Sequence, residues 1–322
     1  MKKVVLRGWA RTAGTCGEWI QGSQRGVPFL VSCPVNRYVN AKVELILKEL
    51  SDIGELGERS FPWFWDLPHD KEKTHRVLIN FALAKDLPPF QAKLHLTSQL
   101  PIGKGMASST ADMVAALGSL IQALELPWEP QELVKFLLEI EPSDPVMFPG
   151  VTEFAHQDGS YMKSLCPRVP AKLLVIDGGG RVDTLSFNKR RDLSSHYSKH
   201  EGTIRKALTL FYEGVREGDI EKIGQASTIS AQCNQEINPK VGFEDFVNWV
   251  NAQEGWGVVT AHSGTLLSGI FPENIPESIE RELEFEAKVR FGLEMVEWME
   301  TTEGGLGGGK EHAWWQFTGS EG

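Results

Sequence analysis

Two neighbouring segments in the first half of the chain have different hydrophobic periodicities. Over residues 91–100 apolar and polar side chains alternate, which predicts a β-strand. From residue 108 to Pro127 apolar side chains recur at three- and four-residue spacing, which predicts a helix. The apolar positions of this helix are Met113, Val114, Ala116, Leu117, Leu120, Ile121 and Leu124. A strand therefore leads through a short loop directly into a helix.

Strand and helix patterns continue on both sides of this unit. Alternating or β-rich stretches predict strands at residues 3–11, 28–34, 38–47 and 171–177. Helical spacing predicts helices at residues 74–87, 130–141, 196–213 and 219–235. Residues 255–271 have the pattern of two strands joined by a turn around His262-Ser263-Gly264-Thr265. The mixture predicts an α/β protein.

Three stretches interrupt these patterns. Glycines punctuate residues 14–22, which predicts a turn region. Residues 51–73 are irregular and rich in tryptophan and phenylalanine, and we expect a lid or an excursion there. Residues 304–310 contain five glycines, and we expect a frayed tail in preference to a segment that folds over a ligand.

The loop before the predicted helix has the features of an anion site. Residues 100–111 read Leu-Pro-Ile-Gly-Lys-Gly-Met-Ala-Ser-Ser-Thr-Ala, so three hydroxyl side chains fall at the N-terminus of the helix. The first backbone N–H groups of a helix are unpaired and the helix dipole is positive there, which favours a bound phosphate. Gly103 and Gly105 allow the backbone to approach that phosphate closely.

Two common glycine signatures do not fit this loop. A Walker A motif needs Gly, four residues and then Gly-Lys-Ser/Thr, whereas Lys104 lies between the two glycines. A dinucleotide fingerprint needs a third glycine where Ser108 stands. A structural alternative is that Ser108 or Ser109 only caps the helix. A single cap needs one hydroxyl, however, and three follow the glycines here.

Composition and length narrow the class of protein. With 322 residues, 41% of them hydrophobic and 24% charged, the chain is long enough for two domains, and the proline-bearing stretch before residue 171 is the candidate boundary. No apolar run is long enough to span a bilayer, and Arg7 and Arg11 interrupt any signal-peptide core. The four cysteines have neither zinc-site spacing nor the density of a disulfide scaffold. We therefore expect a cytoplasmic protein with reduced thiols and no membrane partner.

The net charge of −10 argues against a nucleic-acid partner, because binding to that backbone requires clustered lysine and arginine. An acidic chain can still bind ATP, since a few local N–H groups, a lysine and a magnesium ion suffice. The sequence does not fix the oligomeric state, and a homodimer is one arrangement it allows.

An acidic turn follows the predicted helix at 130–141. Asp144 lies between Pro142 and Pro145, so its carboxylate is rigidly presented. A carboxylate beside a bound triphosphate can accept the proton of an attacking hydroxyl, and a second one can hold magnesium. The structural alternative is that Asp144 only stabilises a turn, which is the commoner use of aspartate between prolines.

With these residues identified, the chain resembles the GHMP kinases, the family of galactokinase, homoserine kinase, mevalonate kinase and phosphomevalonate kinase. Residues 101–111 are similar to its phosphate loop, Pro-x-x-x-Gly-Leu-Gly-Ser-Ser-Ala-Ala, with Ala107 in place of a glycine. Residues 13–18 resemble the Pro-Gly-Thr-Cys-Gly-Glu opening of the L-threonine kinases of cobalamin synthesis, and residues 141–144 resemble their Glu-Pro-Ser/Thr-Asp segment. Residues 261–265 are similar, more loosely, to the third glycine motif of the family.

The resemblance implies an α/β (α+β) two-domain GHMP kinase fold, with an N-terminal ribosomal-protein-S5-like domain over residues 1–168 and a C-terminal ferredoxin-like domain over residues 169–322. It implies that Asp144 is the catalytic base and that Ser109 binds magnesium. For the carboxylate that completes the implied metal site, Glu141 ranks first and Glu132 and Glu139 are alternatives. The residues implied for ATP are Pro101, Gly103, Lys104, Gly105, Met106, Ala107, Ser108, Ser109 and Thr110. Many members of the family place a lysine in the first motif, where this chain has Thr15.

The implied reaction is transfer of the γ-phosphoryl group of ATP to the hydroxyl of L-threonine. We expect the amino acid in a cleft between the domains, near Thr15, Cys16, Glu18, His262, Ser263 and Gly264. A kinase for another small alcohol, such as homoserine or an isoprenoid intermediate, is the alternative within enzymes. A non-catalytic nucleotide- or metabolite-binding protein with this fold is the alternative from another class.

Overall fold

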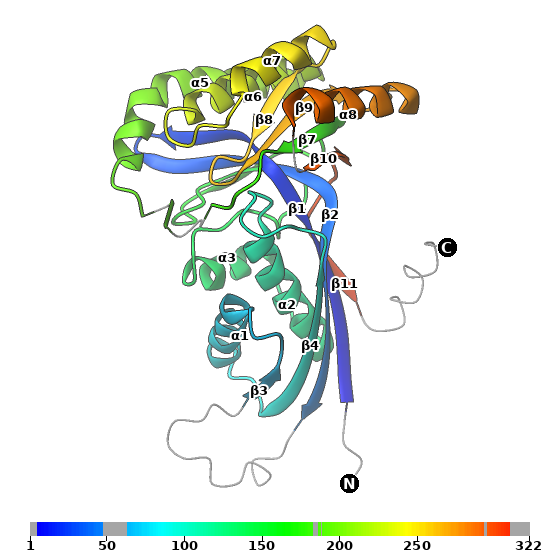
Figure 1. Cartoon of the computed structure of the whole chain (residues 1–322). Coiled ribbons are helices and arrows are strands. Elements are labelled where there is room, and N and C mark those ends of the chain that lie inside the picture. The colour runs from blue at the N-terminus through cyan, green and yellow to red at the C-terminus, as the bar shows by residue number, and fades with distance from the viewer. Residues whose placement is uncertain (1–4, 48–62, 183–185, 188, 293–294, 310–322) are drawn as a thin grey trace.

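The computed structural model describes residues 5–47, 63–182, 186–187, 189–292 and 295–309. Two long antiparallel strands, β1 (Val5–Gln24) and β2 (Val27–Leu47), run through most of the height of the molecule (Figure 1). Alternating apolar side chains of β2, among them Val39, Ala41, Val43 and Leu45, are fully buried. None of the helices in the described ranges combines the length and the apolar character that a membrane span requires.

The first of two groups of elements covers the lower part of this ribbon. In the sheet, β4 (Phe90–Ser98) pairs with β2, and β3 (Trp63–Asp66) runs parallel to β4. Helix α2 (Ser108–Leu124) packs against β1 and β2, and α1 (Glu72–Ala84) and α3 (Pro130–Leu138) pack against α2 (Figure 1). Because α2 lies between the sheet and the other two helices, it is buried along nearly its whole length.

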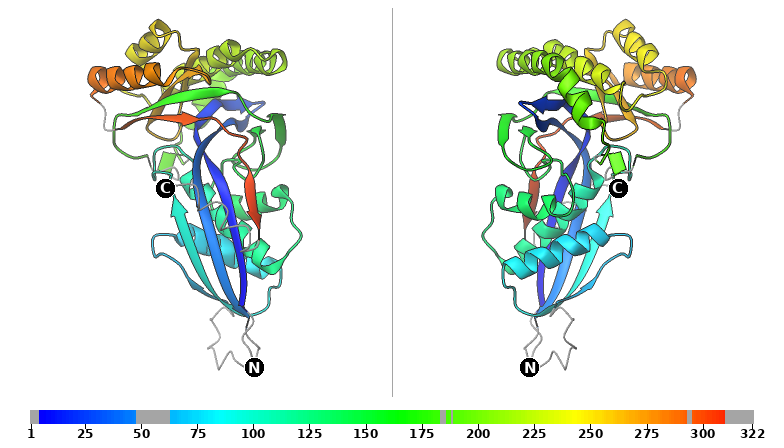
Figure 2. Two further views of the ribbon diagram at one scale, coloured as in Figure 1. Left: turned by 90° about the vertical axis from the view of Figure 1, so that its right-hand side faces the viewer. Right: turned by 90° about the vertical axis from the view of Figure 1, so that its left-hand side faces the viewer.

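The second group covers the upper part. The strands follow the order β10-β7-β9-β8-β1 in one sheet of eleven strands, and the side views show β1 and β2 continuing from the lower group into this one (Figure 2). A single pair, Glu18 opposite Thr260, joins β1 to β8. The strands are β7 (Ala171–Asp177), β8 (Gly257–Thr260), β9 (Leu266–Pro272) and β10 (Met295–Glu300). In addition, β5 (Val151–Phe154) pairs with β2, and β6 (Met162–Cys166) pairs with β5. The helices are α5 (Leu193–Glu217), α6 (Ile220–Asn234), α7 (Phe243–Ala252) and α8 (Glu277–Phe291).

Most of the predicted elements are confirmed. The strand at 91–100 is β4, the helix after the loop is α2, and the strand at 171–177 is β7. The other predicted helices and the β-turn-β unit also form, with bounds that shift by a few residues. All four cysteines are free thiols. The division at residue 168 stays a prediction.

The turn predicted at residues 14–22 is wrong, because this segment is part of β1. The strand carries three register irregularities between Ala13 and Ile20, and Gly17 has a φ of 62°. A Cβ atom at Gly17 would lie 2.3 Å from the carbonyl oxygen of Thr260. These glycines therefore serve bulges and close backbone contacts within a strand.

The tail predicted at residues 304–310 is also wrong. Residues Leu306–Gly309 form β11, which pairs with β1 from Trp9 to Thr12. A Cβ at Gly308 would lie 2.7 Å from the carbonyl oxygen of Trp9, so glycine permits the close pairing. Of the excursion predicted at 51–73, residues 51–62 lie outside the described ranges, and its end forms β3 and the start of α1.

Close packing of α2 on β1 generates a first prediction. A Cβ at Gly8 would lie 2.3 Å from the carbonyl oxygen of Ser119 and 2.4 Å from the backbone nitrogen of Ala123. Gly8→Ala should therefore lower the free energy of unfolding by about 1–3 kcal/mol, measured by urea denaturation. Gly307→Ala is the matched strand control, because nothing lies within 4 Å of its added Cβ. Equal unfolding midpoints for the two variants would contradict the described packing.

Candidate active site

The N-terminus of α2 carries no side-chain cap. Its N-cap residue is Ala107, and no side chain accepts a hydrogen bond from the first turn. The capping role considered for Ser108 or Ser109 is therefore wrong. Since an uncapped helix start presents free N–H groups and the positive end of the helix dipole, this terminus is suited to an anion.

The loop before α2 uses three positive φ angles to expose that terminus. Gly103 has a φ of 74°, Gly105 of 91° and Ala107 of 57°. Glycine adopts this left-handed conformation without strain, whereas an alanine there costs about 1–2 kcal/mol. The family motif has a glycine at the position of Ala107, and the geometry gives the physical reason for that glycine.

Backbone hydrogen bonds fix this loop from two sides. On the β1 side, the Thr15 N–H donates to the Met106 carbonyl (3.2 Å) and the Gly17 N–H donates to the Gly105 carbonyl (3.0 Å). On the β8–β9 side, the N–H groups of Thr265 and Leu266 both donate to the Lys104 carbonyl (3.0 and 3.2 Å). The segments that resemble three separate motifs of the family therefore meet at one loop.

A cavity of about 120 Å³ opens beside this loop. Its lining contains the loop and the start of α2, the acidic turn after α3, and single residues from β1, α1 and the β8–β9 turn. The lining residues are Glu18, Lys73, Ile102, Gly103, Gly105, Met106, Ala107, Ser108, Ser109, Thr110, Glu141, Pro142, Asp144, Val182 and Ser263.

A hydroxyl, a carboxylate and an ammonium group interact within the cavity. Ser109 Oγ donates a hydrogen bond to Glu141 Oε1, and Lys73 Nζ lies 2.6 Å from Glu141 Oε2. Glu141 is buried, so the ammonium group balances its charge. Hydroxyl and carboxylate oxygens are the donors that Mg²⁺ prefers, and the pair therefore fits the magnesium site that the family implies. The alternatives Glu132 and Glu139 bind Lys85 and Asn80 instead and do not line the cavity.

Asp144 is half-buried in the same cavity, in a turn fixed by its neighbours. The Ser143 N–H donates to the His156 carbonyl (3.0 Å), and the Ser143 hydroxyl donates to the Glu141 carbonyl (2.9 Å). Burial, together with the negative charges of Glu18 and Glu141, raises the pKa of Asp144 to about 8. A carboxyl group with this pKa exchanges its proton near neutral pH, and its ionised form can act as a general base.

Glu18 is held by the β8–β9 turn. Its Oε2 accepts hydrogen bonds from the backbone N–H and from Nδ1 of His262, both at 2.9 Å. The other ring nitrogen of His262 lies 3.0 Å from the hydroxyl of Ser230 on α6. Two side chains, Asn234 and Asn238, donate to the His262 carbonyl. Glu18 is thus a buried carboxylate with a fixed orientation at the edge of the cavity.

Some residues expected at the site lie beside it. Lys104 forms an ion pair with Asp177, and neither Lys104 nor Pro101 lines the cavity. Cys16 is buried against the hydroxyl of Ser268, 3.1 Å away, and burial raises the pKa of its thiol to about 12. Thr15 is buried in β1. Of the residues expected for the acceptor, Glu18 and Ser263 line the cavity. His262 and Gly264 do not line it: the His262 N–H donates to Glu18, and the Gly264 carbonyl accepts a hydrogen bond from Asn238.

Sequence reasoning missed Lys73. It is the one cation among the described residues that line the cavity, and it comes from the first turn of α1, 68 positions from its partner Glu141. The run Asp70-Lys71-Glu72-Lys73 at a predicted helix start was the available signal, but such runs usually lie on exposed helix faces.

The comparisons with known proteins agree with this geometry. The family model described as the GHMP kinases N terminal domain matches residues 73–148, a segment that begins at Lys73 and includes the loop, α2 and Asp144. Over these residues the chain is similar to the N-terminal domain of the GHMP kinases.

Among individual proteins, the chain is similar to the L-threonine kinase of Salmonella typhimurium, with 27% identity over 80% of this chain and 81% of that one. Solved structures that share the fold include the following two. The homoserine kinase from Cytophaga hutchinsonii has a TM-score of 0.65 at 16% identity, covering 96% of this chain and 98% of that chain. The mevalonate diphosphate decarboxylase from Enterococcus faecalis, in a structure concerned with ATP binding, has a TM-score of 0.65 at 15% identity, covering 95% and 100%.

The environment of Asp144 predicts an unusual titration. In the ligand-free protein its carboxyl group should lose its proton with a midpoint near pH 8 instead of near pH 4, observed by carbon NMR of the side-chain carboxyl groups. Glu18→Gln removes one of the negative charges that raise this pKa, so the midpoint should move to lower pH. Glu132→Gln is the control, because Glu132 is an exposed residue of α3 that does not line the cavity, and this change should leave the Asp144 midpoint unchanged. An Asp144 midpoint near 4 in the unsubstituted protein would refute the described environment.

Proposed function

We propose that this protein is an ATP-dependent kinase that transfers the γ-phosphoryl group to the side-chain hydroxyl of L-threonine, giving O-phospho-L-threonine and ADP. The observation that carries the proposal is the convergence, in one cavity, of the uncapped start of α2, the Ser109–Glu141 pair and Asp144. The identity of the acceptor rests on similarity to an L-threonine kinase over four-fifths of the chain. The reaction is assigned to the cytoplasm, and its product would feed the aminopropanol linker of cobalamin.

The proposed reaction uses these residues in separate roles. The backbone N–H groups at the start of α2 and the Ser108 hydroxyl bind the phosphates of ATP. Asp144 accepts the proton of the threonine hydroxyl while that oxygen forms a bond to the γ-phosphorus. The bond from the γ-phosphorus to the bridging oxygen breaks, and ADP leaves. Phosphoryl transfer needs little covalent assistance, so positioning and neutralisation of charge supply most of the acceleration.

Ser109 and Glu141 would hold the magnesium ion. When bound, this ion neutralises charge on the phosphate oxygens. Lys73 forms an ion pair with Glu141, which also accepts the hydrogen bond from Ser109. Because Lys73 lines the same cavity, its ammonium group can donate to a phosphate oxygen. Many members of the family have a lysine in the first motif, where this chain has Thr15. In this proposal Lys73 supplies that positive charge instead.

The acceptor would lie at the Glu18 end of the cavity. A buried carboxylate with a fixed orientation is suited to an α-ammonium group, and Ser263 adds a hydroxyl beside it. The same features would accept homoserine, and the structural similarity to a homoserine kinase makes that amino acid the second candidate. An isoprenoid alcohol has no ammonium group, so it would make no charge-assisted contact with Glu18.

The assignment of the base is tested by Asp144→Asn. This variant should lose turnover by about 100-fold or more, because general-base catalysis contributes about 10²–10⁴-fold, and it should still bind ATP. The measurements are steady-state ADP release and calorimetric binding of ATP. Ser109→Ala should instead raise the magnesium concentration needed for half-maximal activity.

The control is Glu132→Gln. Glu132 lies in the same half of the chain, but its carboxylate does not line the cavity. It should retain full activity. Full turnover in Asp144→Asn would exclude this residue as the base, and an unchanged magnesium requirement in Ser109→Ala would exclude that hydroxyl as a metal ligand.

The acceptor is tested with a substrate panel. ADP release from magnesium-ATP should depend on L-threonine, with an equal amount of phosphothreonine detected by mass spectrometry. L-Serine, L-homoserine, mevalonate and galactose complete the panel. Preference for homoserine would keep the kinase and discard the threonine assignment. No ADP release with any acceptor would instead support the non-catalytic binding protein.

A further inference from the structure

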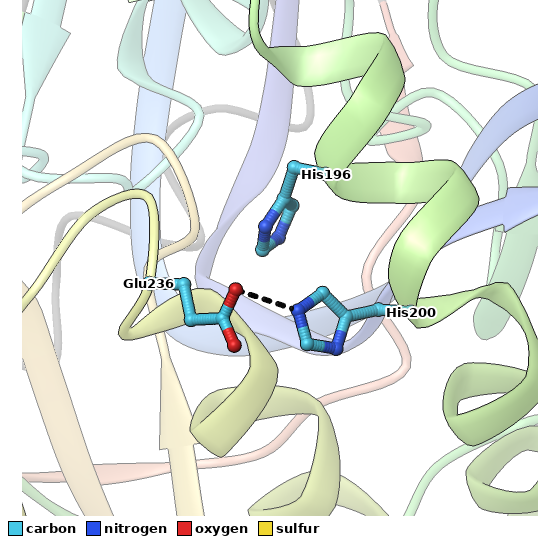
Figure 3. Close-up of side chains that lie close together, drawn as sticks. All are labelled: His196, His200 and Glu236. Atoms are coloured by element: carbon cyan, nitrogen blue, oxygen red, sulfur yellow. Dashed lines mark ion pairs between the residues drawn. The ribbon is translucent and has the colours of Figure 1, made fainter.

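A second group of chemically reactive side chains lies between α5 and α6. His196 and His200 are one helical turn apart near the start of α5, and Glu236 lies in the turn that follows α6 (Figure 3). One potential ligand atom from each of the three lies within 4.8 Å of the others. The two imidazole rings are 4.7 Å apart between centroids, and both are half-buried. Three donors, two from α5 and one from the turn after α6, therefore lie close together.

Two of these donors are already in contact. His200 Nε2 is buried and lies 3.0 Å from Glu236 Oε2, so a cation bound between them would replace a contact that already brings the two ligands together. Two imidazole nitrogens one turn apart plus a carboxylate are a common donor set for zinc.

We propose that His196, His200 and Glu236 form a binding site for a zinc-type divalent cation, with water completing the coordination. The donor set distinguishes this site from the Ser109–Glu141 pair, whose oxygen donors suit magnesium. The histidines come from the first two turns of α5 and the carboxylate from the end of α6, so the cation would join the two helices.

Lys199 acts as the competitor for this site. Its ammonium group lies 2.9 and 2.7 Å from the two carboxylate oxygens of Glu236. The Lys199 side chain is 62% exposed, so it can turn into solvent when a cation takes its place. Metal binding is therefore an exchange of one positive charge for another at Glu236, and removing the lysine should favour the metal.

The position of the site suggests what the cation would stabilise. Helix α6 carries Ser230 and Asn234, and both side chains hold His262, which in turn orients Glu18. A small cavity is lined by His196, His200 and His262 together. A cation that joins α5 to the end of α6 would therefore reinforce the helix that supports Glu18, outside the phosphate site.

The test is zinc binding to the whole chain after dialysis against a chelator. Zinc affinity is measured by competition with a chromophoric chelator, and Co²⁺ ligand-field spectra report the donor set. We expect one high-affinity site, with affinity reduced about tenfold or more in His196→Gln and in His200→Gln. Lys199→Gln should bind zinc more tightly than the unsubstituted protein. Zinc should also raise the thermal midpoint of the unsubstituted protein but not of His200→Gln.

Two control variants separate this site from others. His95→Gln removes an exposed histidine of β4, and Glu141→Gln disables the magnesium pair, so both should retain the zinc site. Glu236→Gln changes an exposed side chain and keeps the test informative if a histidine variant misfolds; it should also weaken binding. Unchanged affinity in His200→Gln and Glu236→Gln, or weaker binding in Lys199→Gln, would overturn the proposal.

Discussion

The site depends on the way the loop before α2 is held by its own backbone. N–H groups of β1 and of the β8–β9 turn donate to the carbonyls of Lys104, Gly105 and Met106. Because the carbonyls are bound from outside, the loop can enter α2 through left-handed residues and leave the first N–H groups of the helix without a cap. The same contacts join the loop to β1 and to the β8–β9 turn at the place where the cavity opens.

A second constraint is the concentration of negative charge around this loop. Glu18, Glu141 and Asp144 line one cavity in a chain of net charge −10. Glu141 is balanced by Lys73 and Glu18 is bound by His262, while the pKa of Asp144 is raised. The arrangement differentiates three similar side chains, since two of the carboxylates have close partners, whereas the desolvated Asp144 can exchange a proton near neutral pH.

Local patterns in the sequence were sufficient for the strand, loop and helix around residues 91–124, because alternation, glycines and helical spacing act over short distances. They failed at residues 14–22 and 304–310, where glycines serve pairing with distant strands. Glu141 and Asp144 were found from the turn and the resemblance, whereas Lys73 was not. Its role follows from the packing of α1 beside α2, which no local pattern records.

The central claim is that the start of α2, Ser109, Glu141 and Asp144 form one phosphoryl-transfer site. Its most direct test is a crystal structure of the protein with magnesium, a non-hydrolysable ATP analogue and L-threonine. We expect the terminal phosphates at the first turn of α2, magnesium bound by Ser109 and Glu141, and the threonine hydroxyl hydrogen-bonded to Asp144. A nucleotide bound elsewhere, or a threonine hydroxyl remote from Asp144, would contradict this account.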